Sequence, residues 1–404
     1  MTADDGDIFT ARGSLLITRV SLHGRIVDIA IDDSGRIADI GENLKREYAG
    51  SADFIIDGEE NLAYPGFANT HTHAAMTLLR GYADDLPLQT WLTEKIWPLE
   101  AHLTADDVYW GTRLACLEMI KSGTTAFNDM YFFMEDAARA VDECGMKAML
   151  AYGFIDLFDE EKREREIRAT ESLVRNLKSM NNPRIRAAVG PHAVYTVSSE
   201  GLTYLSDFAR EQGIGIHVHL SETEKEVQDS LREFGVRPPE RLDACGILTP
   251  RTVAAHCNWL SRAECALLAE RRVNVAMNPV SNMKLAVNRA PPYHWLRELR
   301  VPVTLGTDGA ASNNNLDLLE EMKFAALMQK FYWNHETLLP ADEAVEMATS
   351  AGTRALGFGS GRLERGEAAD IVLIRRSAVC NTPCYNANSN LVYACNGSAV
   401  DTVI

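Results

Sequence analysis

Basic residues are scarce in this chain, and long apolar runs and paired cysteines are missing from it. Its 404 residues include 40 lysines and arginines against 57 aspartates and glutamates, a formal net charge of −17. Such an acidic surface repels phosphate backbones, which argues against a nucleic-acid partner. No apolar run reaches the length of a membrane span. The first residues, MTADDGDIFTARG, lack the basic and apolar segments of a signal peptide. We therefore expect a cytoplasmic protein without a membrane partner.

The eight cysteines are scattered, and no two of them form a CxxC pair. This spacing excludes a small disulfide scaffold and favours reduced, mostly buried thiols. Cys380 and Cys384 are close in sequence, but two ligands without further partners make a poor metal site.

The middle of the chain alternates between apolar strand-like runs and amphipathic helical segments. Eight such runs follow one another: YPGFANTHTH, GTTAFNDM, KAMLAYGFID, IRAAVGPHA, GIGIHVHLSE, TVAAHC, VNVAMNPVSN and PVTLGTDGA. Eight βα units in series predict a (β/α)8 barrel. A doubly wound open sheet is the alternative, but it requires a glycine-rich phosphate loop after the first strand, and none follows YPGFANTHTH.

Short strands are predicted at both ends of the chain. Four lie within residues 14–57, and after residue 361 the runs GRLERGEAADIVLI, SNLVYACNG and VDTVI again read as strands. We therefore expect a small β-sandwich domain built from residues 1–61 and 361–404, with the catalytic barrel in residues 62–360. VDTVI reads as a strand cut short, so we expect the small domain to lack its final strands.

Histidines concentrate at the carboxyl ends of the predicted barrel strands, where barrel enzymes hold their active sites. Six of the chain's 10 histidines are there, namely His71, His73, His192, His217, His219 and His256. A single such histidine is more often a hydrogen-bonded core residue than a ligand. The joint pattern favours a site, because His71 and His73 share one face of a strand.

Neutral imidazoles and one carboxylate are suitable ligands for Zn²⁺ with one position left open for water. We predict one divalent metal ion, Zn²⁺ by default, held by His71, His73, His219 and Asp308. Iron and manganese accept the same ligands. Zinc lowers the pKa of its bound water from about 15.7 to about 7, and Asp308 would help to deprotonate that water. Strand 4 lacks the lysine that bridged two-metal sites commonly use, which favours a single ion.

Other polar residues near these strand ends are candidates for proton transfer. His256 could orient the activated water. Glu222, three residues beyond His219, could carry protons between water and substrate. His217 lies a layer deeper and is interpreted as structural. Glu224 and Glu226, in the acidic stretch SETEKE, are expected to be solvated.

Motifs along nearly the whole chain resemble the amidohydrolase superfamily, and within it most closely the 5-methylthioadenosine/S-adenosylhomocysteine deaminases. These motifs are PGFANTHTHAAMTLLRG, WPLE, SGTTAFNDM, GPHAVYTVS, HVHLSETEKE, AAHCNWL, NPVSNMKLA and LGTDGAASNNNLDLLEEMK. The resemblance implies a barrel with a β-sandwich and zinc-dependent hydrolytic deamination of an adenosine-type nucleoside to its inosine analogue. It assigns the metal to the same four residues, proton transfer to Glu222 and water orientation to His256.

The resemblance also implies the substrate contacts. It assigns the ribose hydroxyls to Glu100 in WPLE and a nucleoside contact to His192 in GPH. Relatives that accept S-adenosylhomocysteine can carry an arginine after strand 3, where this chain has Tyr152. Without that charge-assisted contact, the sequence favours 5'-deoxyadenosine or 5'-methylthioadenosine. Trp91 and Trp97 are candidates to line the pocket.

Three other functions remain open at this point. A guanine or other free-base deaminase, or a triazine hydrolase, would use the same metal ligands. A non-catalytic scaffold on the same fold is disfavoured, since all four predicted ligands are present together with Glu222 and His256. As partners we expect a small nucleoside substrate and other copies of the chain in a homo-oligomer.

Overall fold

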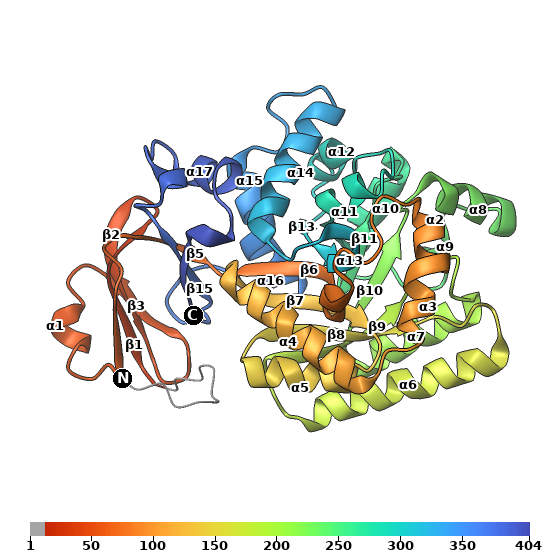
Figure 1. The fold of residues 1–404 in the computed structure, drawn as a ribbon, viewed down its shortest axis with the longest axis horizontal. Coiled ribbons are helices and arrows are strands. Elements are labelled where there is room, and N and C mark those ends of the chain that lie inside the picture. Colours follow the sequence, from red (N-terminus) through yellow and green to blue (C-terminus); the bar gives the residue numbers. More distant parts are fainter. Residues whose placement is uncertain (1–12) are drawn as a thin grey trace.

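The computed structural model describes residues 13–404 and contains two sheets (Figure 1). The larger sheet has nine strands, β6 (Phe67–His73), β7 (Thr124–Tyr131), β8 (Lys147–Phe154), β9 (Ile185–Pro191), β10 (Gly215–Leu220), β11 (Thr252–His256), β12 (Asn274–Met277), β13 (Val303–Leu305) and β14 (Asp308–Gly309). They follow chain order and pair in parallel. β13 and β14 are two parts of the eighth strand, and β14 pairs with β6, so the sheet closes. The predicted (β/α)8 barrel is confirmed.

Helices surround the barrel, and several begin at the side-chain caps that their sequences offer. Thr104 before α4 and Ser261 before α10 form capping boxes with Asp107 and Glu264. The larger helices are α4 (Ala105–Lys121), α5 (Met134–Cys144), α6 (Glu160–Ser179), α7 (Ser199–Gln212), α8 (Glu224–Phe234), α10 (Arg262–Arg271) and α14 (Leu318–Tyr332). Shorter ones are α9 (Pro238–Ala244), α11 (Pro279–Lys284), α12 (Tyr293–Glu298), α13 (Ala310–Asn313), α15 (Ala341–Glu346), η3 (Met347–Ala351) and α16 (Gly352–Ala355). The short helix α1 (Lys45–Tyr48) lies away from the barrel, beside the smaller sheet (Figure 1).

One further group of short helices matters for the site, because it lies between β6 and α4. It comprises η1 (Ala74–Leu79), α2 (Leu88–Thr90), the π-helical turn η2 (Trp91–Ile96) and α3 (Trp97–Glu100). This stretch crosses the mouth of the barrel before the chain enters α4.

The smaller sheet joins both ends of the chain, as expected (Figure 1). Its seven strands are β1 (Leu15–Leu22), β2 (Arg25–Ile31), β3 (Ile37–Gly41), β4 (Phe54–Asp57), β5 (Asn61–Pro65), β15 (Ile371–Arg375) and β16 (Val400–Val403). It divides at β1, whose first half pairs with β4 while Ser21 pairs with β5. A bulge at the division places Arg19 at a φ of +59°.

Two details of the small domain differ from expectation. The run SNLVYACNG was predicted to be a strand, but it mostly forms helix α17 (Ala387–Tyr393), which Asn386 caps at Ser389. Its buried Leu391 and Val392 pack in the main core, so an apolar run too short to show a helical period misled the prediction. The chain passes from the small sheet to the barrel between Pro65 and Phe67, slightly beyond the predicted boundary at residues 61 and 62.

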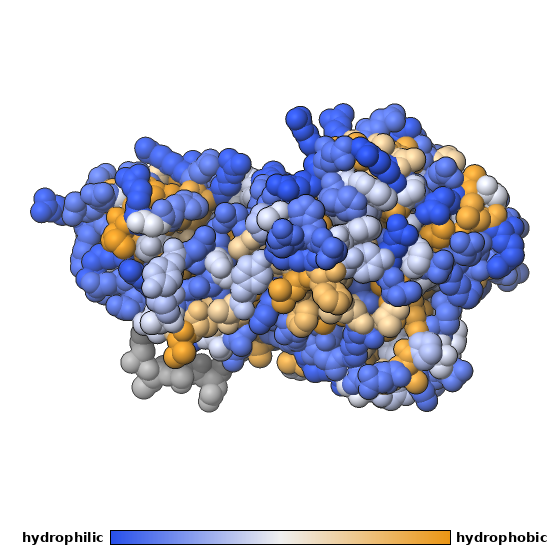
Figure 2. Space-filling view, turned by 90° about the horizontal axis from the view of Figure 1, so that it is seen from above, coloured by the Kyte–Doolittle hydropathy of each residue, from blue (hydrophilic) through white to orange (hydrophobic). Residues whose placement is uncertain are grey.

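Polar residues cover most of the surface seen in Figure 2, where hydrophobic residues form patches near the centre and toward both ends of the molecule. None of the helices in residues 13–404 combines the length and the apolar character needed to cross a bilayer.

Candidate active site

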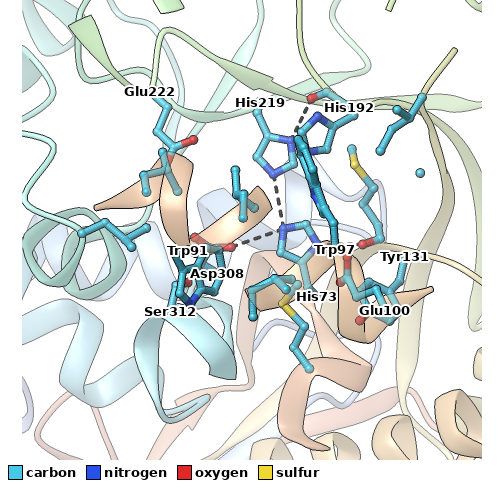
Figure 3. A pocket seen from close by; sticks show the side chains of 18 of the residues that line it. His73, Trp91, Trp97, Glu100, Tyr131, His192, His219, Glu222, Asp308 and Ser312 are labelled. Carbon is cyan, nitrogen blue, oxygen red and sulfur yellow. Dashed lines mark hydrogen bonds and ion pairs between the residues drawn. The ribbon is translucent and has the colours of Figure 1, made fainter. Parts of the chain in front are cut away.

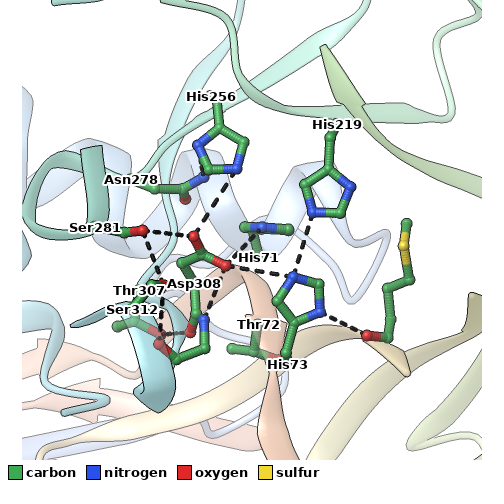
Figure 4. A network of polar contacts seen from close by, with 12 residues as sticks. His71, Thr72, His73, His219, His256, Asn278, Ser281, Thr307, Asp308 and Ser312 are labelled. Atoms are coloured by element: carbon green, nitrogen blue, oxygen red, sulfur yellow. Dashed lines mark hydrogen bonds and ion pairs between the residues drawn. The ribbon is translucent and has the colours of Figure 1, made fainter. Parts of the chain in front are cut away.

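The predicted metal ligands meet at the carboxyl end of the barrel (Figure 4). Asp308 Oδ1 lies 3.3 Å from Nε2 of both His71 and His73. His219 Nε2 lies 3.3 Å from His73 Nε2. Two overlapping groups could hold a metal ion, His71 with His73 and His219, and His71 with His256 and Asp308. Strands β6, β10, β11 and β14 therefore bring the five side chains together.

The hydrogen bonds of two histidines show which ring nitrogens are free. His73 Nδ1 lies 2.7 Å from the carbonyl oxygen of Met130, and His219 Nδ1 lies 2.8 Å from that of His192. A carbonyl only accepts, so each Nδ1 must carry the proton. In the neutral rings both Nε2 atoms then present lone pairs to each other and to Asp308. Such a convergence of acceptors fits a cation between them.

His71 fits the same arrangement. Its Nδ1 lies 2.7 Å from Nε2 of His217, and its own Nε2 is buried without a hydrogen-bond partner. If His71 Nδ1 donates to His217, then Nε2 is free to ligate. Burial lowers the pKa of His71 to about 4, so the ring is neutral near pH 7. His217 lies deeper, as expected, and supports a predicted ligand.

Asp308 is held by residues to which the sequence analysis gave no role. Ser281 Oγ donates to Asp308 Oδ2 at 2.7 Å and lies 2.9 Å from Ser312 Oγ. Burial acts to raise the pKa of Asp308, but the surrounding imidazoles, His71 first among them and then His256 and His73, hold it well below its usual value. Ser281 belongs to the NPVSNMKLA motif, whose asparagines and serine were the available signal.

Glu222 and His256 face each other beside the ligand group. His256 lies 4.0 Å from Glu222 through Nδ1 and 3.9 Å from Asp308 through Nε2. Burial raises the pKa of Glu222. The backbone takes left-handed φ values at Ser221 (+48°), His256 (+71°) and Asp308 (+64°). Non-glycine residues rarely adopt such values, and they often mark functional sites.

Glu226 was expected to be solvated, and that prediction is wrong. Its side chain is only 4% exposed. Its two carboxylate oxygens accept from the backbone N–H groups of Ser221 (2.9 Å) and Glu222 (2.8 Å). Burial raises the pKa of Glu226 to about 7, although these two N–H groups act to lower it. Glu226 therefore holds the main chain that carries Glu222, whereas Glu224 is exposed as expected.

Replacing Glu226 with glutamine should lower kcat about tenfold or more and leave the metal content unchanged. A carboxamide can accept only one of the two backbone N–H groups and turns its own NH2 toward the other, so Glu222 shifts. Steady-state kinetics with metal analysis checks this. Glu224→Gln is the matched control and should behave like the unaltered protein. An unchanged kcat in Glu226→Gln would contradict the role.

A pocket with about 720 Å³ of empty space, part of it open to solvent, covers the ligand group. His73, His219, Asp308 and Glu222 lie on its floor and wall, and His192 borders it (Figure 3). Burial lowers the pKa of His192 to about 3, so this ring is also neutral.

The opposite side of the pocket comes from the stretch between β6 and α4. Trp91 and Trp97 line it, as expected, and Glu100 lies across the histidines from Glu222 (Figure 3). Burial raises the pKa of the Glu100 carboxyl, and the neighbouring Tyr131 acts to lower it. Tyr131 was not singled out from the sequence, although it ends the second barrel strand.

The pocket offers no lysine or arginine side chain to an acidic substrate group. On β8 the lining residue is Gly153, followed by Ile155, whereas Tyr152 does not line the pocket. None of the lysines and arginines within residues 13–404 lines it either. Tyr152 is therefore not the side chain that decides whether the pocket can pair a carboxylate. The lining as a whole contains no arginine.

The barrel, the terminal sheet and this cluster of histidines with an aspartate define a class of protein. Residues 62–404 match the model of the amidohydrolase family, and the chain belongs to that family. It is 62% identical over 403 residues to a 5'-deoxyadenosine deaminase of Methanoregula boonei, which covers 100% of this chain and 91% of the relative. It is 50% identical over 353 residues to 5-methylthioadenosine/S-adenosylhomocysteine deaminase 1 of Archaeoglobus fulgidus, covering 87% and 83% respectively.

A solved structure is also similar. The crystal structure of an adenosine deaminase from Xanthomonas campestris with bound zinc has a TM-score of 0.89 and 34% identity, covering 96% of this chain and 91% of that one.

Proposed function

We propose that this chain is a metal-dependent hydrolytic deaminase of adenosine-type nucleosides. It would convert the 6-amino group of 5'-deoxyadenosine, 5'-methylthioadenosine or S-adenosylhomocysteine to the inosine analogue and release ammonia. The observation that carries the proposal is a single pocket with a metal-ligand group and Glu222 at one end and Glu100 at the other. The names of the relatives at 50% and 62% identity support the same chemistry.

His71, His73, His219 and Asp308 would hold one divalent ion, with Zn²⁺ favoured by the three imidazoles and by the zinc in the similar adenosine deaminase. When bound, such an ion supplies Lewis acidity that lowers the pKa of a water molecule to about 7. The backbone carbonyls of Met130 and His192 keep two of the rings in the ligating orientation.

Glu222 moves the protons. Its carboxylate takes a proton from the attacking water and passes it to a ring nitrogen of the purine. The water oxygen bonds to C6, and Glu222 then takes the second proton from the hydroxyl now on C6 and gives it to the amine. The C6–N bond breaks, ammonia leaves, and C6 keeps the oxo group. His256, between Glu222 and Asp308, orients the water. The sum is one water consumed and one ammonia released for each oxo group formed.

The apolar pocket wall predicts the order of substrates. With no lysine or arginine in the pocket lining to pair its carboxylate, S-adenosylhomocysteine loses a charge-assisted contact worth about 1.5–3 kcal/mol. We expect its kcat/KM to be at least about tenfold below those of 5'-deoxyadenosine and 5'-methylthioadenosine. Ammonia release from these three compounds and adenosine, measured side by side, tests this order. Absence of ammonia release from every purine nucleoside would overturn the proposed function and favour a non-catalytic scaffold.

Glu100 separates a nucleoside deaminase from a free-base deaminase or a triazine hydrolase. A carboxylate can accept hydrogen bonds from both hydroxyls of a ribose, and a free base offers none. Glu100→Gln should therefore raise KM for the best nucleoside about 10- to 100-fold, with a smaller effect on kcat. Glu94→Gln, at an exposed position of the same stretch, is the control. Unchanged turnover of the best substrate in Glu100→Gln would move the assignment to the alternatives.

We also propose a homo-oligomer. Exposed apolar side chains on α14 support it, among them Phe331 with 91% of its surface exposed and Leu327 with 44%. Light scattering of the purified protein tests this, and a monomeric mass at micromolar concentration would contradict it.

A further inference from the structure

A buried chain of asparagine side chains connects Glu222 to His256. Asn258 Nδ2 donates to the backbone carbonyl oxygen of Glu222 at 3.1 Å. Asn282 Nδ2 donates to Asn258 Oδ1 at 3.0 Å. Asn282 Oδ1 lies 2.8 Å from Nδ1 of His256. All three side chains are at most 2% exposed, so water does not compete for these bonds.

The direction of this chain follows from its first member. The Glu222 carbonyl can only accept, so the Asn258 amide must turn its NH2 toward it and its oxygen away. That oxygen can only accept, so Asn282 must present its NH2 to Asn258. Asn282 then presents its oxygen to His256, so Nδ1 of His256 must carry a proton. Each step excludes the reversed amide, because reversal would bring two acceptors or two donors together.

A third asparagine supports the same direction. The side-chain amide of Asn278 makes sense only with its NH2 directed at the carbonyl oxygens of Met277 (3.2 Å) and Gly306 (3.1 Å). Its oxygen is then 3.3 Å from His256 Nδ1. Two amide oxygens from independent parts of the network thus meet the same ring nitrogen.

We propose that Asn258 and Asn282 are positioning residues. They keep a proton on Nδ1 of His256 and hold the His256 ring in a fixed position relative to Glu222. The Nε2 atom, which faces Asp308 at 3.9 Å, is then the one free to accept a proton or a hydrogen bond at the reacting centre. This series of hydrogen bonds joins the two residues assigned to proton transfer. One end is bonded to the main chain of Glu222, and the other end is bonded to the ring of His256. This inference rests on the proposed function for its catalytic meaning, but the position of the proton can be measured without it.

The first experiment uses the unaltered, metal-loaded protein. Selective ¹⁵N labelling of histidine and multiple-bond ¹⁵N–¹H correlation distinguish a protonated ring nitrogen from an unprotonated one, and a His256→Asn sample identifies the signal. We expect a protonated Nδ1 and an unprotonated Nε2. A proton on Nε2 with a bare Nδ1 would overturn the proposal. This measurement needs no substrate. If the expected spectrum came from a protein that released no ammonia from any purine nucleoside, the proposed function would be refuted and this inference would stand.

The second experiment compares two substitutions at Asn282. Asn282→Asp keeps an acceptor at His256 Nδ1, whereas Asn282→Leu removes it. We expect kcat to fall about tenfold in Asn282→Asp and about 100-fold in Asn282→Leu, with KM within about threefold and the metal retained. A purely structural role predicts the reverse order, since a buried extra carboxylate destabilises more than leucine does.

The control is Asn274→Leu. Asn274 is also a buried asparagine, at the start of β12, and donates to the carbonyl oxygens of Pro250 and Thr252 at the far end of the barrel. Its substitution should reduce the melting temperature without changing kcat of the folded fraction. Equal losses of kcat in Asn274→Leu and Asn282→Leu, or the reversed order at Asn282, would overturn the positioning role.

Discussion

Replacing Glu222 with glutamine is expected to lower kcat for 5'-deoxyadenosine by about 10²- to 10⁴-fold while the metal stays bound. The carboxylate lies 4.0 Å from His256 and lines the same pocket as the ligands, but it belongs to neither group of metal ligands. Glutamine keeps the volume and loses the ability to carry a proton. Steady-state kinetics and metal analysis on the same sample check the result.

Two outcomes would contradict this role of Glu222. One is a loss of kcat smaller than about tenfold. The other is a loss that follows the metal content, which would place Glu222 among the ligands. Glu224→Gln provides the control, because Glu224 is two residues away and exposed.

Removing the metal with a chelator should reduce the rate of ammonia release to that of a blank with chelator and no protein. Adding Zn²⁺ should restore the rate. The imidazoles of His71, His73 and His219 alone offer no acid strong enough to activate water at neutral pH. His71→Ala should give the same loss and should purify without metal, since it removes the buried Nε2 that no other group satisfies. Elemental analysis and activity on the same preparation check both.

His102→Ala is the matched control, because His102 is exposed and away from the pocket. Full activity in a chelated sample shown to be free of metal would contradict the proposed metal dependence. Restoration by iron or manganese in place of zinc would correct only the identity of the ion.

The barrel could be predicted from the sequence because its strands are regular. Eight apolar runs with helical segments between them define the order of the strands. Because the carboxyl ends of parallel barrel strands lie at the same rim, the histidines at those ends are expected there together. The two-residue spacing of His71 and His73 was enough to put both on one face. These features depend on local periodicity, which a single sequence displays directly.

Other parts of the site could not be predicted, because they depend on contacts between distant segments. Glu226 looked like a surface residue in an acidic run, and only the left-handed turn at Ser221 brings two backbone N–H groups to its carboxylate. Ser281 and Asn282 lie on a short helix after β12, and their contacts with Asp308 and His256 require the closed barrel. Glu100 was assigned only through the resemblance, since its sequence surroundings suggest a helix end.

Most of the pocket residues that would recognise a substrate come from a different part of the chain than the catalytic groups, with His192, directly after β9, as the exception. The residues assigned to chemistry lie at the ends of barrel strands, whereas Leu88, Trp91, Trp97 and Glu100 all come from residues 88–100 of the stretch that crosses the barrel mouth. Exchanging residues 88–100 for those of a relative should therefore change the substrate preference and leave the catalytic residues in place. This segment is therefore a single target for engineering deaminases of other nucleoside analogues.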